Sequence, residues 1–317
     1  MGFYTSLGGS SRPRQRASSG SATRSLALAA KIEQGKELAA ALQQVLELHR
    51  PDFPPAQRPL APPPAGVDAA ATLKRHQRAA LAGIGLFNRS ARADAKRTAQ
   101  ASAEMEIAAA VDANQWAAYA YQTELDSLWQ RLLNNDPEIV VGTLGEAFED
   151  NEAAAAPVGV SGTEASVVVL VPSPSAVPER KPALTPAGNL TLKKLTKREL
   201  ADFYKLMVCG YVLVTVKEAL AVAPGLTHVR VVAIRTMGSD AYGRLNVEAV
   251  LAGRFARQAL VGVQWSTASA TTIVNDASDE LLLRQTGASK ELTGLDLYSN
   301  PDIASLINAV DLTDLTS

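Results

Sequence analysis

Apolar positions recur at helical spacing through the N-terminal half of this 317-residue chain. Over residues 25–49 the leucines and Ile32 recur at near-helical spacing, which predicts a first helix. Pro51 cannot continue a helix, so we expect the helix to end there. Seven prolines then occupy the 14 positions 51–64 and predict an extended, stiff spacer or strap. A ligand for a proline-recognition module is the alternative interpretation.

Residues 67–134 contain no proline and consist largely of good helix formers. They predict one very long helix or a bent pair, with the kink at Gly83 and Gly85. Apolar residues gather at the two ends of this stretch, whereas residues 89–104 are rich in alanine and charge. We therefore expect the ends to pack and the middle to be solvated or to lie on a polar partner. No strict heptad runs through it, which weakens the case for a sustained coiled coil.

The chain changes character after this stretch. Capping residues precede a proline at 134–137, so a short helix is expected from Pro137 to about Glu152. The small residues at 153–162 are typical of a linker, and we place the domain boundary there.

Residues 163–317 alternate β-branched runs with helical patterns, which predicts a globular α+β domain with a mostly antiparallel or mixed sheet. Helices are expected at 196–220, ended by Pro224 and Gly225, and at 303–310. Strands are expected at 166–171, 228–236, 244–251, 260–265 and 271–274.

The first 25 residues carry four arginines among glycines and serines and have almost nothing to bury, so we expect a flexible basic arm. The predicted organisation is α+β: the arm at 1–25, a largely helical region at 26–152 with the spacer at 51–64, and the globular domain at 163–317.

Charge divides sharply along the chain. Residues 1–97 hold 15 Lys and Arg against 6 Asp and Glu, whereas the remaining 220 residues hold 16 against 26. We expect this division to separate an elongated helical part from a globule. The basic half either contacts an anionic partner such as nucleic acid or docks on the acidic half or on a neighbouring copy.

A nucleic-acid surface would need several cations on one face. On a continuous helix Arg75, Arg78, Arg89, Arg92 and Lys96 fall within one broad sector. No aromatic residue interleaves with them to stack on bases, so binding would be directed at the backbone and depend on salt. The candidate nucleic-acid-binding residues are Arg12, Arg14, Arg16, Arg75, Arg78, Arg89, Arg92 and Lys96.

Most signatures of enzymatic chemistry are missing from the sequence. It contains no phosphate-binding loop, no glycine fingerprint for a dinucleotide and no nucleophile elbow, and its three histidines lie in separate segments. We therefore expect no cofactor and no metal bound by histidine. The single Cys209 cannot form an intramolecular disulfide and fits a cytoplasmic protein. The longest apolar run, 206–216, is too short to span a membrane, and Gly2 with Ser6 fits only a loose myristoylation pattern.

One acidic arrangement resembles the site of restriction-type nucleases. Asp240 in a predicted loop, Glu248 on the following strand and Glu218 or Glu199 on the preceding helix could hold Mg²⁺ for phosphodiester cleavage. That family has a lysine two residues after the strand glutamate, but here the position is Val250. Arg254 would have to take its place.

Two hypotheses follow. The first is a non-enzymatic interaction or scaffold protein that engages a protein partner or a second copy, with nucleic acid as a further candidate partner. The second is a metal-dependent phosphodiesterase domain carried on a basic helical arm. The sequence alone does not decide between them.

Overall fold

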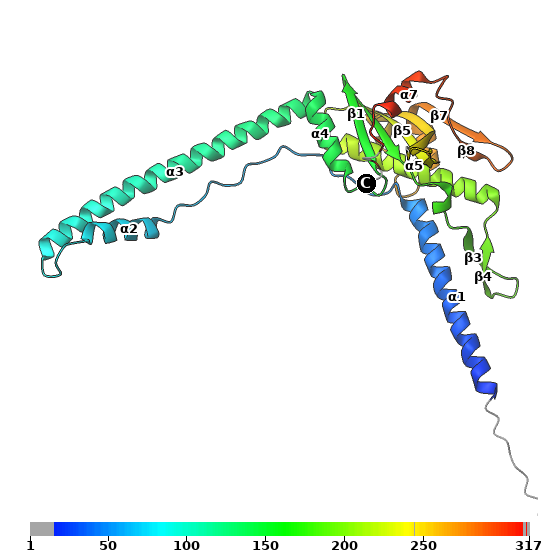
Figure 1. Ribbon diagram of the computed structural model, residues 1–317, viewed down its shortest axis with the longest axis horizontal. Helices are drawn as coiled ribbons and strands as arrows, with labels where there is room; N and C mark the ends of the chain where they lie inside the picture. Colours follow the sequence, from blue (N-terminus) through cyan, green and yellow to red (C-terminus); the bar gives the residue numbers. More distant parts are fainter. Residues whose placement is uncertain (1–15, 244, 313–314, 316–317) are drawn as a thin grey trace, which may run out of the picture. The chain divides into compact units, whose positions relative to one another are not determined.

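The computed structural model describes residues 16–243, 245–312 and 315. Over these residues the chain is an α+β fold with seven α-helices and a mixed six-stranded sheet (Figure 1). The chain divides into two units, each with its own internal contacts. Unit 1 takes residues 1–54, 141–222 and 226–317, and unit 2 takes residues 55–140 and 223–225.

Unit 1 is built on the six-stranded sheet. In order across the sheet the strands are β1 (Ala155–Ser161), β2 (Glu164–Leu170), β5 (His228–Ser239), β6 (Leu245–Ala256), β7 (Ser278–Thr286) and β8 (Glu291–Thr293). Neighbours are antiparallel except β2 and β5, which are parallel. Parallel neighbours need a long crossover connection, and it contains α5 (Lys197–Val222). The prediction of a mostly antiparallel or mixed sheet is confirmed.

Further elements complete the chain around this sheet. They are α1 (Arg16–Glu47), α4 (Pro137–Phe148), η1 (Pro174–Ala176), β3 (Arg180–Leu184), β4 (Leu190–Lys194), η2 (Arg257–Leu260), α6 (Ala270–Ala277) and α7 (Pro301–Asn308). Strands β3 and β4 form a separate antiparallel hairpin beside α1.

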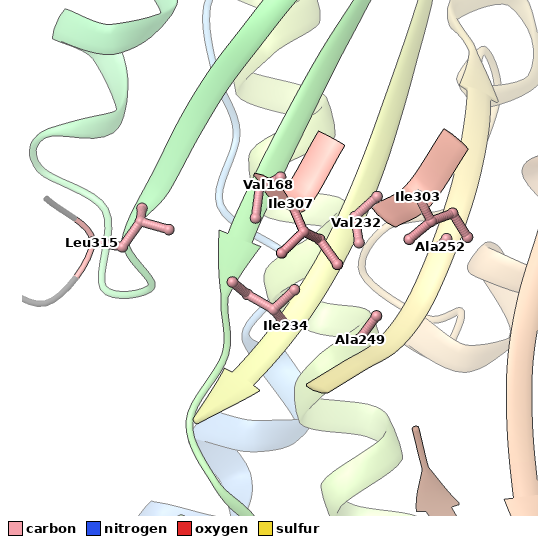
Figure 2. Packing of buried hydrophobic residues seen from close by; sticks show 8 residues of the cluster. All are labelled: Val168, Val232, Ile234, Ala249, Ala252, Ile303, Ile307 and Leu315. Atoms are coloured by element: carbon pink, nitrogen blue, oxygen red, sulfur yellow. The ribbon is translucent and has the colours of Figure 1, made fainter. Parts of the chain in front are cut away.

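Side chains alternate along each strand, so successive residues lie on opposite faces of the sheet. Both faces are covered. On one face Val232 of β5 and Ala252 of β6 belong to a buried cluster with Ile303 of α7 (Figure 2). The alternate β5 residues Val231 and Ala233 are fully buried as well and point to the opposite face, where α5 packs. The sheet is therefore enclosed between α7 and α5.

Helix α5 lies inside unit 1, with 14 of its 26 residues buried. A capping box fixes its start: the Glu199 N–H donates to Thr196 Oγ1 (3.2 Å), and the Thr196 N–H donates to Glu199 Oε2 (2.8 Å). Lys181 of β3 also pairs with Glu199. Gly210 allows close packing, since a Cβ there would lie 2.8 Å from a methyl carbon of Leu48. The predicted helix over 196–220 is confirmed.

Unit 2 is a helical hairpin of α2 (Ala69–Leu81) and α3 (Arg89–Leu133), which lie side by side (Figure 1). The chain turns back between them near Gly83, whose φ of 83° suits glycine. The predicted kink is thus a complete reversal, and no continuous helix spans 67–134. Asn88 caps the start of α3 by accepting a hydrogen bond from the Ala91 N–H (3.3 Å).

The proline-rich segment runs along α3, and we call residues 55–67 the strap. The Arg58 guanidinium donates two hydrogen bonds to the Asp126 carboxylate, each 2.6 Å long. The Ala61 N–H donates to Gln122 Oε1 (2.8 Å), and Asn114 Nδ2 donates to the Ala65 carbonyl (2.8 Å). Polar side chains of α3 thus satisfy a backbone that prolines prevent from forming regular structure.

Four expectations need correction. Residues 153–162 are not a linker, because β1 gains strand structure by pairing with β2. Residues 271–274 are helical within α6, since Ser269 Oγ accepts from the Thr272 N–H (3.2 Å) and caps the helix, and 260–265 form turns rather than a strand. Helix α1 begins at Arg16, inside the segment expected to be flexible, because extending an established helix costs little. Residues 1–15, with Arg12 and Arg14, lie outside the described residues.

We predict that Gly225→Ala destabilises unit 2. A Cβ on Gly225 would lie 2.4 Å from the Leu133 carbonyl oxygen, and the Gly225 carbonyl accepts a hydrogen bond from Asn135 Nδ2 (3.0 Å). We expect a loss of about 1–3 kcal/mol in urea unfolding. Gly142→Ala in α4 is the control, because its Cβ would contact nothing within 4 Å and alanine favours a helix by about 0.5–1 kcal/mol. Equal stabilities for the two variants would contradict this packing.

We also predict an acid-dependent contribution from Glu199. Its pKa is lowered to about 2, mainly by the hydrogen bond from Lys181 and then by those from Thr196. A carboxyl whose pKa falls on folding stabilises the fold above its ordinary pKa and loses that effect as pH falls through the folded value. The difference in unfolding free energy between the wild type and Glu199→Gln should therefore be constant near neutral pH and shrink between pH 4.5 and about 2. A difference that does not change over this range would contradict the ion pair.

Candidate functional site

The strand glutamate of the nuclease hypothesis is held in an ion pair. Glu248 Oε2 on β6 accepts hydrogen bonds from Nε (3.0 Å) and Nη2 (2.7 Å) of Arg235 on β5. Arg235 is only 11% exposed and also lies over the Tyr204 ring of α5. Burial disfavours its charge, but the hydrogen bonds with Glu248 and Tyr204 prevail and raise the Arg235 pKa. Glu248 thus neutralises a nearly buried cation.

The other candidate acids have separate partners. Glu218 on α5 accepts from Asn151 Nδ2 (2.6 Å), and burial raises its pKa, so its environment favours the neutral form. Asp240 stabilises its own turn by accepting from the Tyr242 N–H (2.8 Å). Glu199 belongs to the capping box of α5. Among the residues that the structure describes, no three His, Cys, Asp or Glu side chains group so as to hold a metal ion.

Arg254, the residue required to replace the missing lysine, belongs to a charge ladder across the sheet. Its Nε donates to Glu164 of β2 (2.6 Å), and its Nη1 donates to Asp279 of β7 (2.9 Å). Arg230 of β5 likewise bridges Glu164 (2.9 Å) and Glu280 (3.0 Å). Acids and arginines of β2, β5, β6 and β7 therefore neutralise one another across the sheet, which accounts for these residues without a ligand.

The predicted basic surface is divided by the reversal of the chain. Arg75 and Arg78 lie on α2, whereas Arg89, Arg92 and Lys96 lie on α3, so the single sector of a continuous helix does not form. Arg75 pairs with Glu106, and Arg92 Nη1 donates to the Ile84 carbonyl (3.2 Å). The side chains of Arg78, Arg89 and Lys96 are exposed. Arg16 begins α1 and belongs to unit 1.

Charge is also distributed differently from our expectation. Unit 2 contains nine Lys and Arg and nine Asp and Glu, and unit 1 contains the other 22 and 23. The division by charge therefore does not separate the two units. It lies within unit 2, where residues 55–97 hold eight cations and two acids, and residues 98–140 hold one cation and seven acids. Unit 2 thus has no net formal charge, but its positive charges lie mostly in the first half of its sequence and its negative charges in the second half.

Helix α3 presents an uncovered face that the sequence analysis did not identify. Trp116 is 70% exposed, Tyr119 is 67% exposed and Met105 is 75% exposed. At 100° per residue these side chains point to one side of the helix. Between residues 98 and 123 the exposed residues on that side, which we call the α3 open face, are Thr98, Ala101, Ser102, Met105, Ala108, Ala109, Asp112, Trp116, Tyr119, Ala120 and Thr123.

Part of the opposite side of α3 is covered by α2 and the strap. Ala99 and Ala103 are buried against α2, and Asn114 and Gln122 bind the strap. The sequence alone could not separate covered from open alanines, because both belong to the same alanine-rich run. Only the position of α2 and the strap assigns the open face.

Unit 1 contains a cavity of about 560 Å³ between the last turns of α1, the 150–153 loop and α5. Among the described residues that line it, the charged ones are the carboxylates Glu47, Asp150 and Glu152. Glu47 is already paired with Arg50 (2.6 Å) and Glu152 is near the Tyr211 hydroxyl (3.5 Å). The cavity could accept a small cation with an apolar body, but its geometry selects no particular ligand.

Lys217 forms a further cluster that sequence reasoning missed. Its ammonium lies 4.2 Å from the centre of the Trp265 ring and donates to the backbone carbonyls of Pro51 and His49. Burial lowers the Lys217 pKa. His49 is itself buried, with Nε2 3.0 Å from the Ala268 carbonyl. These contacts fasten the end of α1 and the 263–268 loop to α5, which is a structural role.

No protein-family model matches this chain, and no curated protein or solved structure matches it. Every helix among the described residues is too short or too polar to cross a membrane.

We predict that Glu248 contributes to stability rather than to metal binding. Glu248→Ala leaves the nearly buried Arg235 without its partner and should cost about 3 kcal/mol in urea unfolding. Glu149→Ala on the exposed end of the α4 segment should change stability by less than about 0.5 kcal/mol. Mg²⁺ or Mn²⁺ should leave the melting temperature of the wild type unchanged. A metal-induced rise that Glu248→Ala abolishes would contradict this assignment, because a bound ligand stabilises the folded state.

Proposed function

We propose that this chain is a non-enzymatic interaction protein whose helical unit 2 supplies the partner-binding surface. The observation that carries the proposal is the α3 open face. It runs from Thr98 to Thr123 and exposes Trp116 and Tyr119, whose residue types are enriched at the energetic centres of protein interfaces. Exposed apolar stripes of this kind mark binding sites.

The support of α3 by its neighbours suits this role. The strap binds α3 through Arg58, Ala61 and Ala65, and α2 packs against the N-terminal part of the helix, where Arg75 pairs with Glu106. A helix held in this way is ordered before it meets a partner, so binding costs less conformational entropy. The strap and α2 leave the α3 open face exposed.

The chemistry of the open face favours a protein over nucleic acid. The two aromatic side chains lie in the acidic part of α3, close to Asp112 and Glu124, which would repel phosphate. The exposed Arg78, Arg89 and Lys96 lie at the other end of unit 2. Nucleic-acid contact through these cations is the outcome that would change the proposal. The single, fully buried Cys209 supports a cytoplasmic location, since the chain uses no disulfide.

A photo-reactive residue at Tyr119 tests the interaction in cells that produce the protein. We expect a discrete protein adduct from position 119 and none from position 121, because Tyr121 is on the opposite side of α3. The adduct should disappear with Trp116→Ser. Equal adducts from both positions, or none from either, would contradict the proposal.

Two further measurements test the competing functions, nucleic-acid binding and phosphodiester cleavage. A random-sequence DNA duplex should show no mobility shift at physiological salt; a shift that is lost on neutralising Arg75, Arg78, Arg89 and Arg92 would replace the protein partner with nucleic acid. Incubation of plasmid DNA and of RNA with Mg²⁺ or Mn²⁺ should give no cleavage. Cleavage that Glu248→Ala abolishes would establish the phosphodiesterase instead.

A further inference from the structure

We propose that the partner of the α3 open face is a second copy of the same face, packed antiparallel. This inference rests on the proposed interaction function. Two properties of α3 favour this pairing: the distribution of large and small side chains and the distribution of charge.

The open face is self-complementary in size. Its large aromatic residues, Trp116 and Tyr119, lie toward the C-terminal end, and small residues, Thr98 and Ala101, lie toward the N-terminal end. An antiparallel pair centred between residues 108 and 109 places each Trp116 opposite Ala101 of the other copy. The same register places each Tyr119 opposite Thr98. The large aromatic side chains then meet small ones, which two helices need for close approach.

The centre of this register consists of Ala108 and Ala109, which both are exposed. Alanine lets two helix backbones approach closely, and its methyl group loses no rotamer freedom on burial. A parallel pair would instead place Trp116 against Trp116 and leave the alanines opposite one another across a gap. Size complementarity therefore selects the antiparallel arrangement.

Charge selects the same arrangement. Residues 89–97 of α3 carry four cations and one acid, whereas residues 98–130 carry five acids and no cation. In the proposed register residues 89–97 lie opposite residues 120–128, which contain Glu124 and Asp126 and no Lys or Arg. The basic end of each α3 then lies alongside the acidic end of the other and attracts it at long range, whereas Arg89, Arg92 and Lys96 themselves point away from the open face. A parallel pair would place like charges together along the whole helix.

Asp112 is the one charged residue among the members of the open face. In the proposed register it lies next to Met105 of the second copy, where its carboxylate would lose water without gaining a partner. Asp112→Ala should therefore strengthen the pairing.

Light scattering after size exclusion tests the pairing on the full chain. We expect the wild type to reach twice the mass of one chain and Trp116→Ala/Tyr119→Ala to dissociate on the order of a hundredfold more readily. Tyr121→Ala is the matched control, since it removes a half-exposed tyrosine of the same helix from the opposite side and should leave the dimer intact. Asp112→Ala should bind more tightly, and high salt should weaken all the dimers.

Disulfide trapping tests the direction. A mixture of Ala101→Cys and Gln115→Cys chains should form a mixed disulfide dimer. Neither variant should link to itself, because identical positions would lie roughly 20 Å apart, beyond the reach of a disulfide. Cys209 does not compete, since it is buried and burial raises its pKa to about 12.

Each outcome decides the inference. A wild type that is monomeric at every concentration, a dimer unaffected by Trp116→Ala/Tyr119→Ala, or Ala101→Cys chains that link to themselves would overturn it. If the chain is monomeric but Tyr119 still gives an adduct with a different protein, self-pairing fails and the proposed interaction function stands. If no adduct and no dimer form, both fail.

Discussion

The parallel pairing of β2 and β5 is the constraint on which unit 1 depends. Two parallel neighbours cannot be joined by a tight turn, so the chain must cross one face of the sheet between them. Here α5 is part of that crossing, and it packs against β5 on one side and α1 and α6 on the other. Its buried residues, the capping box of Thr196 and Glu199, and the Lys217 cluster all fix this helix in place. The contacts of α1, β3 and α6 follow from its position.

The sequence correctly predicted the elements whose ends are marked by local capping or turn residues. The helix over 196–220 has a capping box at its start and Pro224 with Gly225 after its end, and β5 is an apolar run between turn residues. Elements that depend on distant partners were missed. Strand β1 has the composition of a linker and becomes a strand only because β2 lies beside it, and α6 is rich in β-branched residues but is started by the Ser269 cap.

The candidate functional sites also depend on residues that are distant in the sequence. The sequence singled out Glu248 as an acid on a strand, but the partner that explains it, Arg235, is set by the register between β5 and β6. The α3 open face was not predicted at all. Its residues resemble the covered ones of the same helix, and only the reversal at Gly83 and the course of the strap decide which alanines remain exposed. A surface that stays exposed because no other element packs on it leaves no recognisable pattern in the local sequence.

Unit 2 is an insertion within unit 1, because residues 1–54 and residues 141–222 belong to the same unit. Helix α1 is synthesised before α2 and α3, and its packing partner α5 emerges from the ribosome only after both of them. The nascent chain must therefore carry an unpaired α1 while the hairpin, whose main contacts are local, can already fold. Unit 1 can therefore close only after α5 and the strands that follow it have been synthesised.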